Sequence, residues 1–401
     1  MNERIPTTIG AHCTVTSSKR FHLSERSDSG VPFFCSKEII QRVNGQDITE
    51  CDYIREEFYE QVKSQFGVPQ AGDLLITTRG TYGVPYLYRK TDRFYFADGN
   101  LTWLKDFDDK LLPEYLYYWV KSPEGQGKID AIAKGTAQKA VPIEAVKALH
   151  LSIPTIDEQQ QIAAILSAYD SLIETNQRQI KLLEEAAQRL YREWFVDLRF
   201  PGHEDVPVVD EVPEGWIRGE LGDIAEESGK KEKKENRNEY SYYLPIDCLP
   251  SKSLAYITEN DTALAESSLV SFAAGDILFG AMRPYFHKVV VARDKGLTRT
   301  TCFVLNAKQG VNWSYLLMLL FAKKTIEYAT TISVGTTMPY VRWKDFSHMP
   351  TIMPTSEVSR AFNDIVTPIV KQICHLAMSC EQLSEARDRL LPKLMSGEIA
   401  V

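Results

Sequence analysis

The residues of this sequence best suited to chemistry are basic and amide side chains grouped in polar segments. One cluster combines five basic residues with two asparagines, namely Lys230, Lys231, Lys233, Lys234, Arg237, Asn236 and Asn238. Lysine and arginine neutralise phosphates, and amides can reach base edges. The cluster therefore predicts a nucleic-acid contact, while the glutamates interleaved with it fit a solvated loop equally well.

Further donors follow two similar strings, AGDLLITTRG at 71–80 and AGDILFGAMR at 274–283, or lie in the paired turns GTAQK (135–139) and GTT (335–337). We expect Arg79 and Arg283, near the ends of the two strings, to have a shared role because their placement after the Gly-Asp motif is equivalent. The full set of residues predicted to contact DNA is Lys19, Arg20, Arg79, Tyr82, Gln138, Lys139, Lys230, Lys231, Lys233, Lys234, Arg283, Tyr285, His287, Lys288, Thr336 and Thr337. For each of them singly, a structural role is an equally good interpretation.

Motifs of enzymatic chemistry do not occur in the sequence. It has no GxxxxGK[ST] loop for a nucleotide, no HExxH or zinc-spaced Cys/His set and no GxSxG elbow. An adenine methyltransferase would carry an Asn/Asp-Pro-Pro-aromatic turn, whereas TTMPY at 336–340 has a single proline. Cys374-His375 is better explained by a helix seam. We therefore predict no catalytic residue, no metal site and no cofactor in this chain.

Composition limits the class of protein. With 401 residues and 44% hydrophobic residues, the chain can form two or three domains. It has no run of 18 apolar residues, no signal-peptide pattern and seven scattered cysteines without a CxxC pair. These features favour a cytoplasmic protein with reduced thiols and no membrane span. The net charge of −8 argues mildly against nucleic acid, although it does not exclude local basic faces.

An internal repeat organises the chain. At an offset of 200 residues, KLLEEAAQRL (181–190) matches EQLSEARDRL (381–390), Tyr115-Leu116 matches Tyr315-Leu316, and Gly135-Thr136 matches Gly335-Thr336. The repeat predicts two tandem mixed α/β modules, each followed by a long helix, with pseudo-twofold character. The expected boundaries are 1–154 and 200–354 for the modules, and 155–199 and 355–401 for the helices.

Each module is expected to mix strands and helices. Runs rich in β-branched and aromatic residues predict strands at 73–79, 83–89, 93–97, 100–106, 276–282, 287–293 and 301–307. The segments 113–122 and 312–324 read as helices.

The two long helices show apolar positions at steps of four and three over more than four heptads. The first seam runs through Ile162, Leu166, Tyr169, Ile173, Asn176, Ile180, Leu183, Ala187, Leu190 and Trp194. The second runs through Phe362, Val366, Ile369, Ile373, Leu376, Cys380, Leu383, Arg387, Leu390 and Leu394. This period is typical of a coiled coil. Two unrelated helices on separate surfaces are the alternative.

We expect the two helices to form an antiparallel pair, with Asn176 near Cys380 and Ile180 near Leu376. Thr155 is the expected N-cap of the first helix, and Pro201-Gly202 its expected end. Pro368 is expected to kink or break the second helix.

Several stretches resemble type I restriction-modification specificity subunits. PTIDEQQQIAAILSAYDSLIETNQRQI with LLEEAAQRLYREWFVDLRF is similar to the family's central conserved region, and RDRLLPKLMSGEI is similar to its C-terminal end. AGDLLITTRG, GTAQKAVPIEAV and LSIPTIDEQ resemble recurring pieces of its target recognition domains. The resemblance covers nearly the whole chain.

The resemblance implies a non-catalytic subunit with two target recognition domains that read the two halves of a bipartite sequence in double-stranded DNA. The helices would form the spacer between the domains and would dock two modification (methyltransferase) subunits. Restriction (endonuclease and translocase) subunits would join that core. S-adenosylmethionine, ATP and Mg are then expected on these partner subunits.

Three other interpretations stay open at this point. The chain could serve a related system in which one partner fuses modification and cleavage. It could be a DNA-modifying enzyme with an unrecognised active site. It could also be a scaffold that does not bind DNA, which would lack a steep salt dependence of duplex binding.

Overall fold

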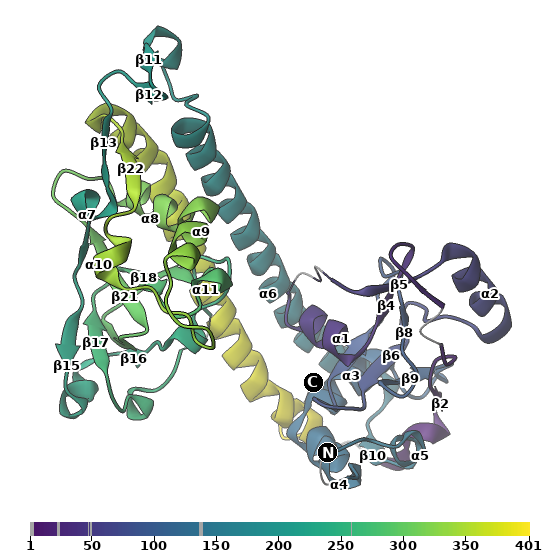
Figure 1. Cartoon of the computed structure of the whole chain (residues 1–401). Coiled ribbons are helices and arrows are strands. Elements are labelled where there is room, and N and C mark those ends of the chain that lie inside the picture. Colours follow the sequence, from purple (N-terminus) through teal and green to yellow (C-terminus); the bar gives the residue numbers. More distant parts are fainter. Residues whose placement is uncertain (1–3, 22–24, 47, 49, 136–138, 258) are drawn as a thin grey trace. The chain divides into compact units, whose positions relative to one another are not determined.

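The structure, a computed structural model, describes residues 4–21, 25–46, 48, 50–135, 139–257 and 259–401. The chain divides into two compact units. Unit 1 comprises Met1–Glu174 and Leu383–Val401, and unit 2 comprises Thr175–Gln382. Two long helices, α6 (Ile156–Tyr191, teal in Figure 1) and α11 (Ser356–Ser396, yellow), each contribute a segment to both units.

Unit 1 contains two four-stranded sheets and a separate strand pair. The first sheet has the order β2 (Thr14–Thr16), β9 (Leu101–Lys105), β6 (Leu74–Thr77) and β7 (Pro85–Leu87). The second has the order β3 (Arg26–Ser27), β5 (Asp52–Ile54), β4 (Val31–Phe34) and β8 (Tyr95–Phe96). The separate pair is β1 (Ile5–Thr8) with β10 (His150–Ile153). The helices are α1 (Ser36–Val43), α2 (Glu56–Phe66), α3 (Pro113–Lys121), α4 (Pro123–Ile132) and α5 (Ile143–Lys147).

Unit 2 also contains two four-stranded sheets. Its first sheet has the order β14 (Ala225–Glu227), β21 (Cys302–Ala307), β18 (Ile277–Gly280) and β19 (Val289–Val291). Its second has the order β15 (Lys230–Glu232), β17 (Leu269–Phe272), β20 (Gly296–Arg299) and β16 (Tyr242–Tyr243). β13 (Ile217–Glu220) pairs with β22 (Pro350–Met353), and β11 (Val208–Val209) with β12 (Val212–Pro213). The helices are α7 (Leu221–Ile224), α8 (Trp313–Phe321), α9 (Lys323–Thr331) and α10 (Trp343–Phe346).

The predicted duplication is confirmed by strand register. Leu74 lies opposite Leu104 in unit 1, and Ile277, its counterpart in the repeated string, lies opposite Leu305 in unit 2. The second sheets differ in strand order. In unit 1, β5 pairs with β4, which precedes it in the chain, whereas in unit 2, β17 pairs with β20, which follows it. The duplication is therefore preserved in the first sheet and has diverged in the second.

The repeated Gly-Asp dipeptide closes a turn before the central strand of each first sheet. Asp73 Oδ2 accepts a hydrogen bond from the backbone N–H of Gln70 at 2.9 Å, and Asp276 Oδ2 accepts one from Ala273 at 2.8 Å. Burial raises the pKa of both carboxyl groups, while these hydrogen bonds partly offset that effect. The strands that follow, LLIT and ILFG, are buried throughout. The motif is thus a structural turn that leads directly into a core strand.

The two long helices contact each other, antiparallel, within each unit. In unit 2, Asn176 Nδ2 donates to Ser379 Oγ at 3.2 Å, and the rings of Trp194 and Phe362 lie 5.7 Å apart. In unit 1, Arg387 Nη1 donates to Asp170 Oδ1 at 2.5 Å. The predicted proximity of Asn176 to Cys380 is confirmed, because a hydrogen bond with Asn176 partly offsets the burial that raises the pKa of the Cys380 thiol.

The buried stripe of the helices is wider than the predicted seam. The seam residues Ile162, Leu166, Ile180, Phe362 and Val366 are buried as expected. Residues beside the seam are buried as well, namely Ala163, Glu184, Tyr191, Val370, Ala377, Leu391 and Met395. The reason is that each helix segment also packs against the module of its own unit, so it needs a second apolar face.

The expected break at Pro368 and the expected end of the first helix at Pro201-Gly202 are wrong. Residues 356–396 form one uninterrupted α-helix, so Pro368 does not break it. Pro368 and the residue four positions before it, Asp364, are exposed, so the carbonyl that loses its donor can face solvent. The α-helical part of α6 ends at Tyr191, ten residues before Pro201, and a π-helical turn, η3 (Arg192–Val196), follows it.

The expected N-cap of α6 is present, since Thr155 Oγ1 accepts from the Glu158 N–H at 3.4 Å. In the part of the chain that the structure describes, no helix combines the length and apolarity needed to cross a membrane.

Candidate nucleic-acid interface

In each unit, the turn that follows the first sheet's buried strand bridges to a residue just after the glycine-threonine motif. In unit 1, Arg79 and Lys134 both form isolated bridges with Ala140. The side chains of Arg79, Lys134 and Lys139 are exposed, so three cations share this edge. Residues 136–138, which include the predicted contact Gln138, lie outside the described residues. Lys134 was missed in the sequence because it precedes the turn motif.

The register corrects the expected equivalence of the two arginines. In unit 2 the matching bridges join Met282 and Val334 to Tyr340, so Arg79 corresponds to Met282 and not to Arg283. Arg283 is the next residue and has a left-handed backbone, with φ of 51°. The one-residue difference arises because the shared strands set the register, whereas the residues after them belong to turns of different shape.

Arg283 organises the turn of unit 2. Its backbone N–H donates to Pro339 O at 2.7 Å, and its Nη2 donates to Thr337 O at 3.2 Å. The side chains of Thr336 and Thr337 are exposed beside it. These contacts fix the loop that carries the two threonine hydroxyls.

The remaining predicted contacts of this loop differ in exposure. Tyr285 is 49% exposed and its neighbour Phe286 is 44% exposed, with ring centroids 4.8 Å apart. His287 Nε2 lies 2.9 Å from Phe321 O, and burial lowers the pKa of its imidazole. Lys288 Nζ donates to Ile246 O at 2.7 Å. The exposed aromatic pair is therefore accessible for stacking with a bound partner, while His287 and Lys288 already have partners within unit 2.

The basic cluster at 230–238 is a strand followed by a 3-10 helix, η5 (Lys234–Glu239), and not an irregular loop. Lys234 forms an ion pair with Glu266, and Arg237 Nη1 donates to Ala263 O at 3.2 Å. Asn236 Nδ2 donates to Glu232 at 3.1 Å. Lys230, Lys231 and Lys233 are exposed, so these three lysines form the accessible part of the cluster.

The corresponding residues of unit 1 are arranged differently. Lys19 and Arg20 are exposed, and the Lys19 ammonium lies 4.8 Å from the ring centre of Phe66. Tyr82 is half-buried against the core of unit 1. The sequence therefore marked residues that the fold places on several different surfaces of the two units.

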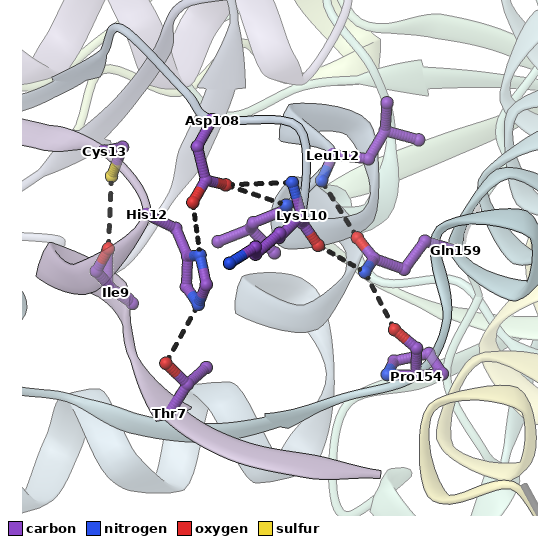
Figure 2. Close-up of polar contacts among 10 residues, drawn as sticks. Thr7, Ile9, His12, Cys13, Asp108, Lys110, Leu112, Pro154 and Gln159 are labelled. Atoms are coloured by element: carbon purple, nitrogen blue, oxygen red, sulfur yellow. Dashed lines mark hydrogen bonds and ion pairs between the residues drawn. The ribbon is translucent and has the colours of Figure 1, made fainter. Parts of the chain in front are cut away.

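Figure 2 shows a polar network in unit 1 that sequence reasoning missed. His12 Nδ1 lies 2.9 Å from Asp108 Oδ2, and His12 Nε2 lies 2.9 Å from Thr7 Oγ1. Burial acts to raise the pKa of Asp108, but hydrogen bonds from His12 and from the Lys110 and Leu111 backbone outweigh it and lower that pKa. The order hydroxyl, imidazole, carboxylate is that of a hydrolytic triad.

The wider contacts of this network show a structural role. Nearby, fully buried Gln159 of α6 accepts from the Leu112 N–H at 2.9 Å and donates to Lys110 O and Pro154 O at 2.8 and 3.0 Å (Figure 2). The network thus ties the first turn of α6 to the loop after β9. Because His12 and Asp108 are 96 residues apart, no local sequence pattern could reveal it.

In unit 2, charged residues tie the helices to the module. Arg293, which is 8% exposed, donates to Glu381 of α11 at 2.9 Å and to Glu259 at 3.0 Å. Glu184 of α6 accepts from Ser253 Oγ and from the Leu254 N–H, both at 2.7 Å. Burial raises the pKa of Glu184 to about 7. Among the described residues, no group of His, Cys, Asp and Glu could hold a metal ion.

A groove of about 1690 Å³ in unit 2 surrounds the end of α6. Its wall combines apolar residues of α8 with four arginines, Arg189, Arg192, Arg199 and Arg218. The π-helical turn η3 lies in this wall, and π-turns inside helices often mark functional sites.

Comparisons with known proteins agree with this arrangement. The family model described as "Type I restriction modification DNA specificity domain" matches residues 11–185 and 213–375. The MjaIX type I restriction enzyme specificity subunit of Methanocaldococcus jannaschii is 25% identical over 73% of this chain and 70% of its own length. The MjaX subunit of the same organism, described as putative, is 24% identical over 88% of this chain and 84% of its own length. The crystal structure of the type I restriction-modification S subunit from M. genitalium has a similar fold, with a TM-score of 0.63 over 98% of this chain and 96% of that one, at 18% identity.

Proposed function

This chain belongs to the type I restriction modification DNA specificity domain family and is a non-catalytic specificity subunit, and from that premise we propose that its two recognition domains read the two halves of a bipartite DNA target. The observation that carries the proposal is the duplicated first sheet, which places a turn at the same register position in both units, with exposed donors near it in each. Two equivalent reading surfaces suit a target with two half-sites.

The contacts with duplex DNA are proposed to come from the exposed donors of each unit. In unit 1 these are Arg79, Lys134 and Lys139, and in unit 2 they are Thr336, Thr337 and the lysines of β15. Cations position the protein on phosphates, while side chains at base edges give sequence specificity. The exposed Tyr285 and Phe286 add apolar contacts for the second half-site.

We propose that α6 and α11 form the spacer that fixes the distance between the half-sites. A 36-residue α-helix is about 54 Å long, which exceeds one turn of B-DNA at about 34 Å. The antiparallel contacts within both units support one continuous helix pair as the spacer.

The proposed partners are two modification subunits, which bind S-adenosylmethionine and methylate adenine, and restriction subunits, which use ATP and Mg. The groove at the end of α6 is a suitable docking site, because it exposes arginines beside apolar side chains, a combination enriched at interfaces. Methyl transfer and cleavage would take place entirely on these partners.

The test is to express the chain with its modification subunits in a host that lacks other adenine methylation and to sequence the methylated adenines. We expect one bipartite motif with an unspecified gap of fixed length. The modification subunits without this chain are the control and should leave no motif. A continuous motif, or the same motif without this chain, would contradict the proposal.

A further inference from the structure

A hollow of about 390 Å³ in unit 1 is lined by residues of β2, β8, β9 and the end of α2. It is lined by four hydroxyl residues, three aromatic residues and two lysines, namely Thr14, Thr16, Ser17, Ser18, Phe66, Tyr95, Trp103, Lys19 and Lys105. Its volume falls within the range of about 300–1,000 Å³ that is usual for ligand sites.

The two ammonium groups are held in place at this hollow. Lys19 Nζ lies 4.8 Å from the ring centre of Phe66, and Lys105 Nζ lies 4.6 Å from that of Trp103. The Lys19 N–H also donates to the Tyr95 hydroxyl at 2.9 Å. Cation–π contacts and a backbone hydrogen bond therefore preorganise two positive charges beside one cavity.

Lys105 is weakly paired within the protein. Its Nζ lies 3.9 Å from Asp106 Oδ2, and the Asp106 side chain is 67% exposed. An exposed ion pair at this distance contributes little, so Lys105 can exchange it for a stronger anionic partner at small cost.

Ser18 provides an independent sign of a missing ligand. Its side chain is 8% exposed, and its Oγ is buried without a hydrogen-bond partner among the described residues. Buried hydroxyls are nearly always hydrogen-bonded, because an unpaired one loses its contacts with water. A ligand oxygen in the hollow would restore the missing bond.

The corresponding place in unit 2 lacks this chemistry. Lys105 lies opposite Thr14 in unit 1, whereas its counterpart Asn306 lies opposite Glu226 in unit 2. By the same register, Val304 stands where unit 1 has Trp103. The fold therefore does not require Lys105 and the indole, and this pair belongs to the first recognition domain alone.

We propose that this hollow, the Lys19–Lys105 pocket, binds one backbone phosphate of the DNA target, with both ammonium groups neutralising it and Ser18 donating to a phosphate oxygen. The inference rests on the proposed function and deepens it. A base is the poorer occupant, because Trp103 and Tyr95 are 3% and 0% exposed and the accessible ring of Phe66 faces an ammonium group. The first half-site is thus anchored by a phosphate contact that the second half-site lacks.

The test uses the full chain assembled with its modification subunits, and measures duplex affinity by fluorescence anisotropy at several salt concentrations. For the Lys19→Gln/Lys105→Gln double variant we expect the slope of log affinity against log salt to fall by about 0.9, because the two lysines together neutralise one phosphate charge, and each single variant should show part of that fall. Ser18→Ala should weaken binding several-fold at every salt concentration without changing the slope, because the hydroxyl is neutral. Lys37→Gln, an exposed lysine of α1 outside the hollow, is the matched control and should leave the slope unchanged.

A second measurement locates the phosphate. Methylphosphonate, which removes one phosphate charge, is introduced at successive positions of the first half-site. One position should weaken wild-type binding but add little further loss to the Lys19→Gln/Lys105→Gln double variant. If the wild type binds its target while the slopes of the lysine variants and every methylphosphonate position show no such coupling, the pocket assignment fails and the proposed function stands. If the assembled wild type shows no target-specific binding, both fail.

Discussion

Asn176 of α6 donates a hydrogen bond from Nδ2 to Ser379 Oγ of α11 at 3.2 Å, between apolar positions of the seam. The neighbouring seam residues Ile180, Ile173 and Leu376 are buried. A polar group in such a seam reduces stability but penalises other registers, in which it would be buried without a partner. This bond therefore specifies the register of the two helices.

Replacing Asn176 with leucine should stabilise the helix pair and weaken its register. We expect an increase in the free energy of unfolding on the order of 1 kcal/mol, because a partly buried amide is replaced by an apolar side chain. The methylome of the variant should show more than one gap length. Arg178→Leu, an exposed change in the same helix, is the control. A single unchanged gap would show that Asn176 does not determine register.

Lengthening both helices by one heptad should lengthen the gap in the DNA target. The insertions belong between Glu174 and Thr175 and between Gln382 and Leu383, where the segments of the two units meet in the sequence, because residues from Ile180 onward pack in the core of unit 2. Seven residues add about 10 Å, which corresponds to about three base pairs. Sequencing of methylated adenines should give the same two half-sites with a longer gap.

An equal insertion after Gln309, in an exposed turn of unit 2, should leave the gap as it is. The spacer role is wrong if the helix insertions preserve methylation with an unchanged gap.

Glu184 should make the stability of unit 2 depend on pH. Burial raises the pKa of Glu184 in the folded protein to about 7, above the ordinary value for a glutamate. The stability that this group contributes is therefore complete below its unfolded pKa and is lost as the pH rises through about 7. Glu184→Gln keeps an oxygen that can accept from Ser253 and Leu254 but carries no charge. We expect the variant to melt at a higher temperature than the wild type at pH 8 and at about the same temperature at pH 5. Glu185→Gln, the exposed neighbour, should show no such divergence.

Removing Arg293 should destabilise unit 2 strongly. The Arg293→Met variant leaves Glu381 and Glu259 together without their shared cation, and breaking a buried ion pair in this way costs about 3–5 kcal/mol. Urea unfolding monitored in unit 2 gives the measurement, with the nearby exposed Lys295→Met as control. Burial raises the pKa of Glu259, so the loss should shrink as the pH falls and this carboxylate becomes protonated. A loss that is independent of pH would assign the effect to packing alone.

The amino-acid sequence by itself determined the duplication, the two long helices, the helix register and most core strands. These features depend on local periodicity and on similarity between the halves, and both can be read along the chain. The pairing of Asn176 with residues 379–380 followed from the twofold pseudosymmetry that the repeat implies.

Only the tertiary structure decided which polar side chains act together. It placed Arg283 one residue beyond the position equivalent to Arg79. It gave Lys234, His287 and Lys288 partners within unit 2, and it joined His12 to Asp108, 96 residues away in the sequence. It also placed Lys105 beside Lys19. Such contacts depend on strand pairing between distant segments and on single hydrogen bonds, and neither leaves a periodic signal in the sequence.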